Sequence, residues 1–88
     1  MVVWTDYMKF RARLRGFDLA EIERIVRSGE ERYIDTVSGR RVVVGRHGRL
    51  RVVIPYEETA GEVIPITVHV TSRQQINFRI RSGRYAHE

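Results

Sequence analysis

The chain has 88 residues, of which 42% are apolar and 31% charged, a composition typical of one small folded domain over residues 1–88. It has no cysteine, which excludes disulfides and thiolate metal sites, and no run of about 18 apolar residues, which excludes a membrane-spanning helix. Sixteen basic residues, fifteen of them arginine, against eleven acidic residues give a net charge of +5. This charge favours an acidic partner such as RNA, DNA or an acidic protein.

The first residues indicate a short strand and then a helix. The β-branched and aromatic run VVW at 2–4 fits an edge strand, and Asp6 can cap a helix that Gly16 ends. Four side chains of this helix share one face at helical spacing: Tyr7, Phe10, Arg11 and Leu14. The opening residues lack the basic-then-apolar order of a secretory signal, so we expect a cytoplasmic protein.

The stretch FDLAEIERIVRSG, residues 17–29, carries the clearest helical signature. Asp18 and Glu21 have the spacing of a capping box, and Gly29 is a natural end. The apolar residues recur three and four apart at Leu19, Ile22, Ile25 and Val26. A second helix is therefore predicted here.

The period then changes from that of a helix to that of strands. Four β-rich runs follow, ERYIDTV at 31–37, RRVVVGR at 40–46, LRVVIPY at 50–56 and VIPITVHV at 63–70. Short separators containing glycine divide them, as in β-hairpins. We expect an α+β fold in which two N-terminal helices precede a four-stranded antiparallel meander, with 2–4 as a possible extra strand.

The closing segment, residues 72–82, fits two patterns. Ile76 and Ile80 are four residues apart, as in a helix, while Ile76, Phe78 and Ile80 also alternate as in a strand. Thr71 and Gln74 have the spacing of a capping box, so we favour a basic C-terminal helix.

The order of these elements resembles a known family. The stretches RGFDLAEIERIV, GRRVVVGRHGRLRVVIPYEE and ITVHVTSRQQINFRIR are similar to the BrnT-type branch of the RelE/ParE toxin superfamily and its uncharacterised relatives. Ser72 and Arg73 match a Thr-Arg pair that opens a basic helix in that branch, and His69 stands where an arginine is expected. The resemblance implies a RelE-like fold, ribonuclease activity on mRNA or at the ribosome, and a small antitoxin-like protein partner.

Three residues are candidates for metal-independent RNA cleavage, which requires groups that move protons and a cation that holds the phosphate. His69 alternates with Val68 and Val70 and so faces away from the core side. Arg73 stands at a predicted helix start, where an arginine and the helix N-terminus would both hold phosphate. Tyr85 follows several arginines. Each has a simpler explanation, namely an exposed histidine, an arginine paired with Glu57 or Glu58, and a disordered tail.

Six further residues are candidates for contacts with nucleic acid. They are Arg46, His47 and Arg49 in the RHGR turn, and Arg79, Arg81 and Arg84 near the end of the chain. The turn residues have an equally ordinary role as solvated hairpin side chains. Trp4 and Tyr7 could stack on bases, although packing in the core or at an edge is the simpler expectation.

Two functional hypotheses follow. The first is a toxin-like endoribonuclease without a metal or other cofactor, because the chain has no zinc-ligand spacing and no phosphate-cradling glycine loop. The second is a non-catalytic module of the same fold that binds nucleic acid or an acidic protein.

Overall fold

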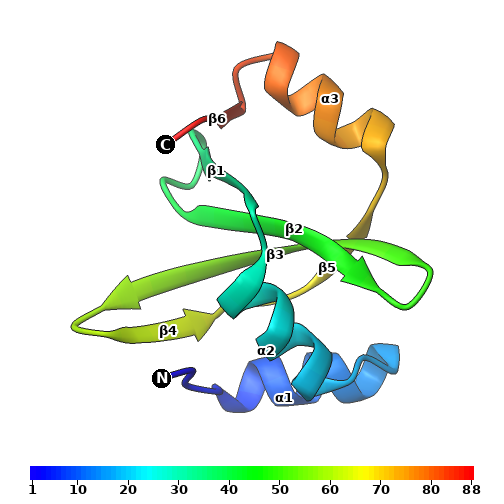
Figure 1. Cartoon of the computed structure of the whole chain (residues 1–88), viewed down its shortest axis with the longest axis vertical. Coiled ribbons are helices and arrows are strands. Elements are labelled where there is room, and N and C mark those ends of the chain that lie inside the picture. Colours follow the sequence, from blue (N-terminus) through cyan, green and yellow to red (C-terminus); the bar gives the residue numbers. More distant parts are fainter.

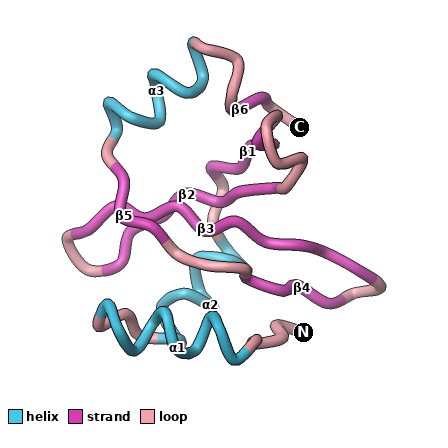
Figure 2. Tube along the Cα trace, turned by 180° about the vertical axis from the view of Figure 1, so that it is seen from behind, coloured by secondary structure: helices cyan, strands magenta, loops and turns pink.

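A six-stranded antiparallel sheet separates two groups of helices in the computed structural model, which describes residues 1–88 (Figure 1). The elements, in chain order, are α1 (Asp6–Arg15), α2 (Leu19–Ser28), β1 (Glu31–Asp35), β2 (Arg41–His47), β3 (Leu50–Thr59), β4 (Glu62–Pro65), β5 (His69–Thr71), α3 (Arg73–Arg81) and β6 (Tyr85–Ala86). Seen from either side, α1 and α2 lie together at one end of the molecule and α3 lies at the other (Figures 1 and 2). The α+β class predicted from the sequence is confirmed.

The strands follow the order β4-β3-β2-β1-β6, and β5 also pairs with β3. The run predicted as the fourth strand of the meander is divided, because β4 pairs with residues 56–59 of β3 and β5 pairs with residues 51–53. Pro65 ends β4, and it has no N–H with which to extend the ladder. Between the two pieces, the Ile66 N–H still donates to the Pro55 carbonyl at 2.8 Å.

The two ends of the chain differ from the prediction. Residues 2–4 form no strand, and Val2 makes only an isolated parallel bridge to Val63. The end of the chain instead supplies β6, in which Tyr85 and Ala86 pair with Asp35 and Ile34 of β1. Tyr85 was expected in a tail but is buried.

Alternation along the central strands produces two hydrophobic cores, one on each face. Val43, Val52 and Ile54 face α1 and α2, where they join the larger core of eleven buried residues. Val42, Val44 and Val53 face α3 and join a smaller core of six. These runs of consecutive valines and isoleucine therefore belong to strands covered on both faces.

Helix α2 packs closely on β2 because Gly45 has no side chain at the contact. A Cβ built there would lie 2.6 Å from Cγ2 of Ile25, which is closer than such atoms approach in folded proteins. The predicted N-cap of this helix is confirmed, since the Asp18 side chain accepts from the Ala20 N–H. Glu21 instead pairs with Arg24.

The N-caps of the other two helices lie one residue away from the predicted caps. Thr5, not Asp6, caps α1, and Ser72, not Thr71, caps α3 by accepting from the Gln75 N–H at 3.1 Å. Residues 73–81 are helical, as favoured from the sequence. None of the three helices is long and apolar enough to cross a bilayer.

Candidate functional site

A hollow of about 480 Å³ lies between α3 and the face of the sheet that carries the smaller core. Apolar side chains, including Val42 and Val53, line part of it. Polar side chains reach it from the β1–β2 turn, β5, α3 and the residue before β6: Arg40, His69, Gln75, Arg79 and Arg84. The hollow therefore collects cations from segments that are far apart in the sequence.

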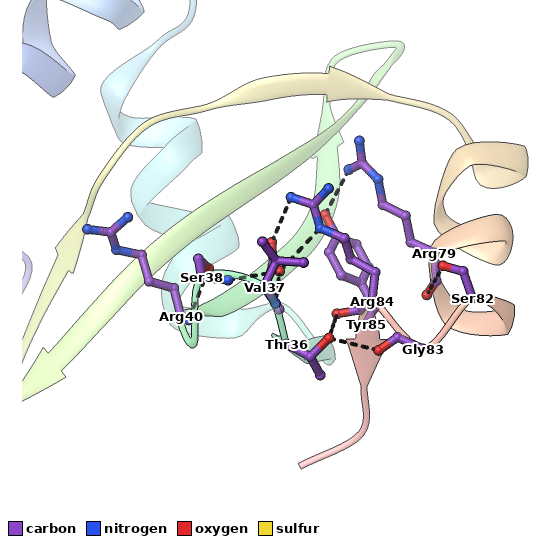
Figure 3. Close-up of polar contacts among 10 residues, drawn as sticks. Thr36, Val37, Ser38, Arg40, Arg79, Ser82, Gly83, Arg84 and Tyr85 are labelled. Atoms are coloured by element: carbon purple, nitrogen blue, oxygen red, sulfur yellow. Dashed lines mark hydrogen bonds and ion pairs between the residues drawn. The ribbon is translucent and has the colours of Figure 1, made fainter.

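Arg84 is held by a buried carboxylate at one side of this hollow (Figure 3). Its Nε and Nη2 donate to the two carboxylate oxygens of Asp35, each at 3.2 Å. Burial raises the pKa of Asp35, but the hydrogen bonds from Arg84 and from the N–H groups of Val37 and Ser38 outweigh it, and the net pKa is below the ordinary value. Asp35 therefore stays ionised, and Arg84 keeps N–H groups beyond the two that this pair uses.

Backbone contacts fix the segment that carries Arg84. The Thr36 hydroxyl donates to the carbonyl oxygens of Gly83 and Arg84, and the Thr36 N–H donates to the Arg84 carbonyl at 2.8 Å (Figure 3). The turn after β1 and the residues before β6 thus form one unit. These contacts hold Tyr85 and Ala86 beside β1, with which they pair.

Arg79 is positioned by an aromatic side chain instead of a carboxylate. Its Nη1 donates to the Tyr85 hydroxyl at 2.9 Å, and its guanidinium lies 5.5 Å from the centre of the Tyr85 ring. Tyr85 in turn stacks on Tyr33, with the ring centres 5.6 Å apart. No acidic side chain forms an ion pair with Arg79. Among the arginines that line the hollow, Arg79 is therefore the one that forms no ion pair.

His69 faces the same hollow from β5, but one side of its ring is occupied. Nη2 of Arg11, which reaches from α1, lies 3.2 Å from Nδ1 of His69. Burial lowers the pKa of His69, and the nearby charges of Arg11, Arg79 and Arg15 lower it further. Because arginine only donates, Nδ1 is the acceptor and the neutral ring carries its proton on Nε2.

Arg73 lies outside the hollow, in an ion pair of its own. Nη1 and Nη2 donate to the two carboxylate oxygens of Glu31, both at 2.7 Å. This contact, with a hydrogen bond from the Tyr33 hydroxyl, lowers the pKa of Glu31 although partial burial raises it. The structure thus separates Arg73 from His69 and Tyr85, the other two residues predicted to act in RNA cleavage.

The RHGR turn supports α2 from the other end of the sheet. Nε2 of His47 accepts from the Asp18 N–H at 2.8 Å, and its ring packs edge-on against Phe17. The Arg46 carbonyl accepts from Arg24 at 2.9 Å.

Five of the nine predicted site residues lie outside the hollow. Besides Arg73, they are Arg46 and His47 of the turn, and Arg49 and Arg81, whose side chains are exposed. Of the nine predicted site residues, the structure brings together His69, Arg79, Arg84 and Tyr85.

A second hollow of about 470 Å³ adjoins the first on the outer side of α3. The two share Gln75, Arg79 and Arg84. Phe78 lines the second one and is 63% exposed, which is unusual for a phenylalanine in a folded domain. Phe78, Gln75 and Arg40 were not among the predicted site residues. The helix period was the available signal for Phe78, since Ile76 and Ile80 face the sheet and Phe78 is therefore rotated away from it.

The arrangement provides hydrogen-bond donors and positive charge beside an exposed aromatic ring. No group of three or more His, Asp or Glu side chains is placed to hold a metal ion. Comparison with protein-family models, curated proteins and solved structures found no match. The resemblance to RelE and BrnT proteins therefore stays a prediction.

Proposed function

We propose that this protein binds single-stranded RNA in the two adjoining hollows beside α3. The observation that carries the proposal is the position of Arg79, which has no acidic partner and lines both hollows. A phosphate would lie against Arg79 and Arg84. The neighbouring base would stack on Phe78.

The chemistry of the lining favours a phosphate over an isolated carboxylate. Guanidinium groups donate two parallel hydrogen bonds to phosphate oxygens. Neutral His69 provides a further donor along the first hollow, as does Arg40 through the N–H groups that its ion pair with Glu57 leaves free. An exposed aromatic ring next to such a groove is what a single strand requires, because each base presents a flat face for stacking. An acidic protein segment would use the charge but would gain little from a lone exposed phenylalanine at the rim.

Binding without cleavage is the form of this function that the geometry supports best. A histidine acting as a general base needs a free ring nitrogen, and Nδ1 of His69 already accepts from Arg11 while Nε2 carries the proton. The Tyr85 hydroxyl is committed to Arg79, and its ring is buried. Arg73, the expected phosphate ligand, pairs with Glu31.

Toxin-like ribonuclease activity is the second candidate. It is favoured by one observation, that His69, Tyr85, Arg79 and Arg84 line the same hollow. It would require Arg11 to leave Nδ1 when RNA binds, which would free that nitrogen to take the proton of a 2′-hydroxyl.

A binding measurement tests the first proposal. Fluorescence anisotropy with a labelled oligouridylate of about ten nucleotides should show saturable binding that weakens steeply as salt rises. Replacing Arg79 by alanine, or Phe78 by alanine, should each raise Kd by about tenfold, the effect expected for losing one phosphate contact or one stacked base.

Arg81→Ala is the matched control, because it removes an exposed arginine of the same helix outside both hollows. Equal effects of Arg79→Ala and Arg81→Ala would show that the charge of the whole surface, and not the hollows, holds the RNA.

The same RNA distinguishes the two candidates when it is incubated with the protein and then separated on a denaturing gel. Intact RNA, with and without ribosomes present, supports binding alone. Cleavage that disappears with His69→Ala supports the ribonuclease and overturns the non-catalytic form.

A further inference from the structure

Helix α1 exposes three large apolar side chains that the fold does not use. Tyr7 is 56% exposed, Phe10 54% and Leu14 64%. They are three and four residues apart, so they form one line along the helix, which we name the α1 stripe. Their spacing in the sequence predicts that they share one face of the helix. In the structure that face is exposed to solvent.

The core contact of α1 is made by different residues. Met8 and Ala12 are fully buried and pack into the larger core with α2 and the sheet. At about 100° per residue, Met8 and Ala12 point roughly opposite to Phe10 and Leu14. The side chains of the α1 stripe therefore take no part in the core. A contiguous apolar line of this kind is typical of an interaction surface.

Basic side chains border the α1 stripe on both sides. By the same helical spacing, Arg11 and Arg15 flank it on one side, and Lys9 and Arg13 flank it on the other. None of these four forms an ion pair with an acidic side chain. Arg11 contacts His69, and the only acidic residue of the helix is Asp6 in its first turn.

We propose that the α1 stripe binds an amphipathic helix of a protein partner that carries aspartate or glutamate beside its apolar line. Anchors at positions i, i+3 and i+7 match the way one helix packs along another. The acidic residues of the partner would pair with Lys9, Arg13 and Arg15. At 1.5 Å per residue the ten residues of α1 extend about 15 Å, so a partner helix of about three turns would cover the surface.

Charge decides between this partner and a second copy of the chain. Two α1 helices packed on each other would bring together two surfaces with four cations and one carboxylate each, and like charges facing each other across an interface disfavour such a dimer. RNA is also a poorer occupant, because Leu14 at one end of the line offers no ring for stacking. Helix α1 lies on the opposite side of the sheet from α3 (Figure 2), although Arg11 at the border of the stripe reaches His69 in the first hollow.

Three synthetic helical peptides test the proposal by isothermal titration calorimetry. The first has leucines at spacings of three and four with glutamates on both flanks, the second has lysines in place of the glutamates, and the third has serines in place of the leucines. Only the first should bind. The double variant Phe10→Ser/Leu14→Ser should weaken its binding at least tenfold, since central apolar anchors carry most of the free energy of such interfaces.

Matched variants and a second measurement keep the result interpretable. Arg13→Glu should weaken the glutamate peptide and admit the lysine peptide, whereas Arg49→Glu, on a distant hairpin, should do neither. Circular dichroism checks that the variants remain folded. Binding of the first peptide by the double variant at wild-type strength would overturn the proposal. So would a wild-type dimer in size-exclusion chromatography with light scattering that the double variant dissociates, or a loss of RNA affinity in the double variant with no peptide bound by either protein.

Discussion

The two faces of the sheet bury different amounts of apolar surface with the same strands. Towards α1 and α2, eleven buried side chains form a continuous core, whereas towards α3 there are six, and an arginine-lined hollow occupies the remaining space. Neighbouring residues such as Val43 and Val44 serve opposite faces. One face therefore provides most of the packing, which leaves the other face free to place cations beside apolar residues.

The largest effects are expected from the substitutions Ile76→Ala and Ile22→Ala, which test this division between the two faces. Both side chains are fully buried, one in each core, and each change should lower the free energy of unfolding by about 2–5 kcal/mol. Because Ile76 docks α3, which carries Phe78 and Arg79, only Ile76→Ala should also weaken RNA binding in protein that is still folded. Urea unfolding and fluorescence anisotropy measure the two effects. Equal losses of affinity in both variants would mean that the two faces are not separable.

A smaller effect is expected at the Asp35–Arg84 pair. Asp35→Asn removes a buried charge that accepts from Arg84 and two backbone N–H groups, and should cost about 1.5–3 kcal/mol at pH 7. The lowered pKa of Asp35 stabilises the folded state above the pKa of the unfolded chain, and that stability is lost as pH falls through the folded pKa. The stability curves of wild type and variant should therefore converge below about pH 4.

Chemical denaturation across a pH series measures this convergence. The alternative result, a constant difference between the curves down to low pH, would show that packing and not charge makes the contribution of Asp35. Arg41→Ala is a suitable comparison, because its ion pairs with Glu58 and Glu88 are exposed and should contribute little at any pH.

The smallest effect is expected at Arg73. Its side chain is 45% exposed, and Glu31 keeps the hydrogen bond from Tyr33 when the arginine is removed. Arg73→Ala should cost about 0.2–1 kcal/mol of stability and change RNA affinity less than about twofold. A tenfold loss of affinity, comparable with that of Arg79→Ala, would return Arg73 to the binding site and contradict the boundary drawn around the two hollows.

The sequence predicted the regular elements well, because their periods are local. The α2 helix with its Asp18 cap and the glycine-separated hairpins follow from local spacing, and the C-terminal segment is helical as favoured, although its cap is Ser72 and not Thr71. The pairing of β6 with β1 depends on contacts across about fifty residues, such as those of Thr36 with Gly83 and Arg84, which no local pattern encodes. The division of the fourth strand depends on where its two pieces pair along β3, with Pro65 at the end of β4.

The candidate site was predictable only in part for the same reason. Alternation placed His69 away from the core that Val68 joins, but Val70, expected on the core side, is 52% exposed and lines the hollow together with His69. Whether a cation is free depends on its partner, and the sequence did not indicate that Glu31 takes Arg73 or that Arg11 reaches His69. The apolar face of α1 was visible in the spacing, but whether it is buried depends on which side the sheet approaches.

The short outer strands have a consequence for how this molecule can be recognised. Two-residue β6 ends the sheet beyond β1, while three-residue β5 and four-residue β4, the latter bridged by Val2, end it beyond β3. Outer strands of this length offer few unpaired backbone groups to an extended peptide or to another sheet. Strand addition and edge-to-edge aggregation are thus disfavoured. Partners are therefore recognised through side chains that project from the helices and turns.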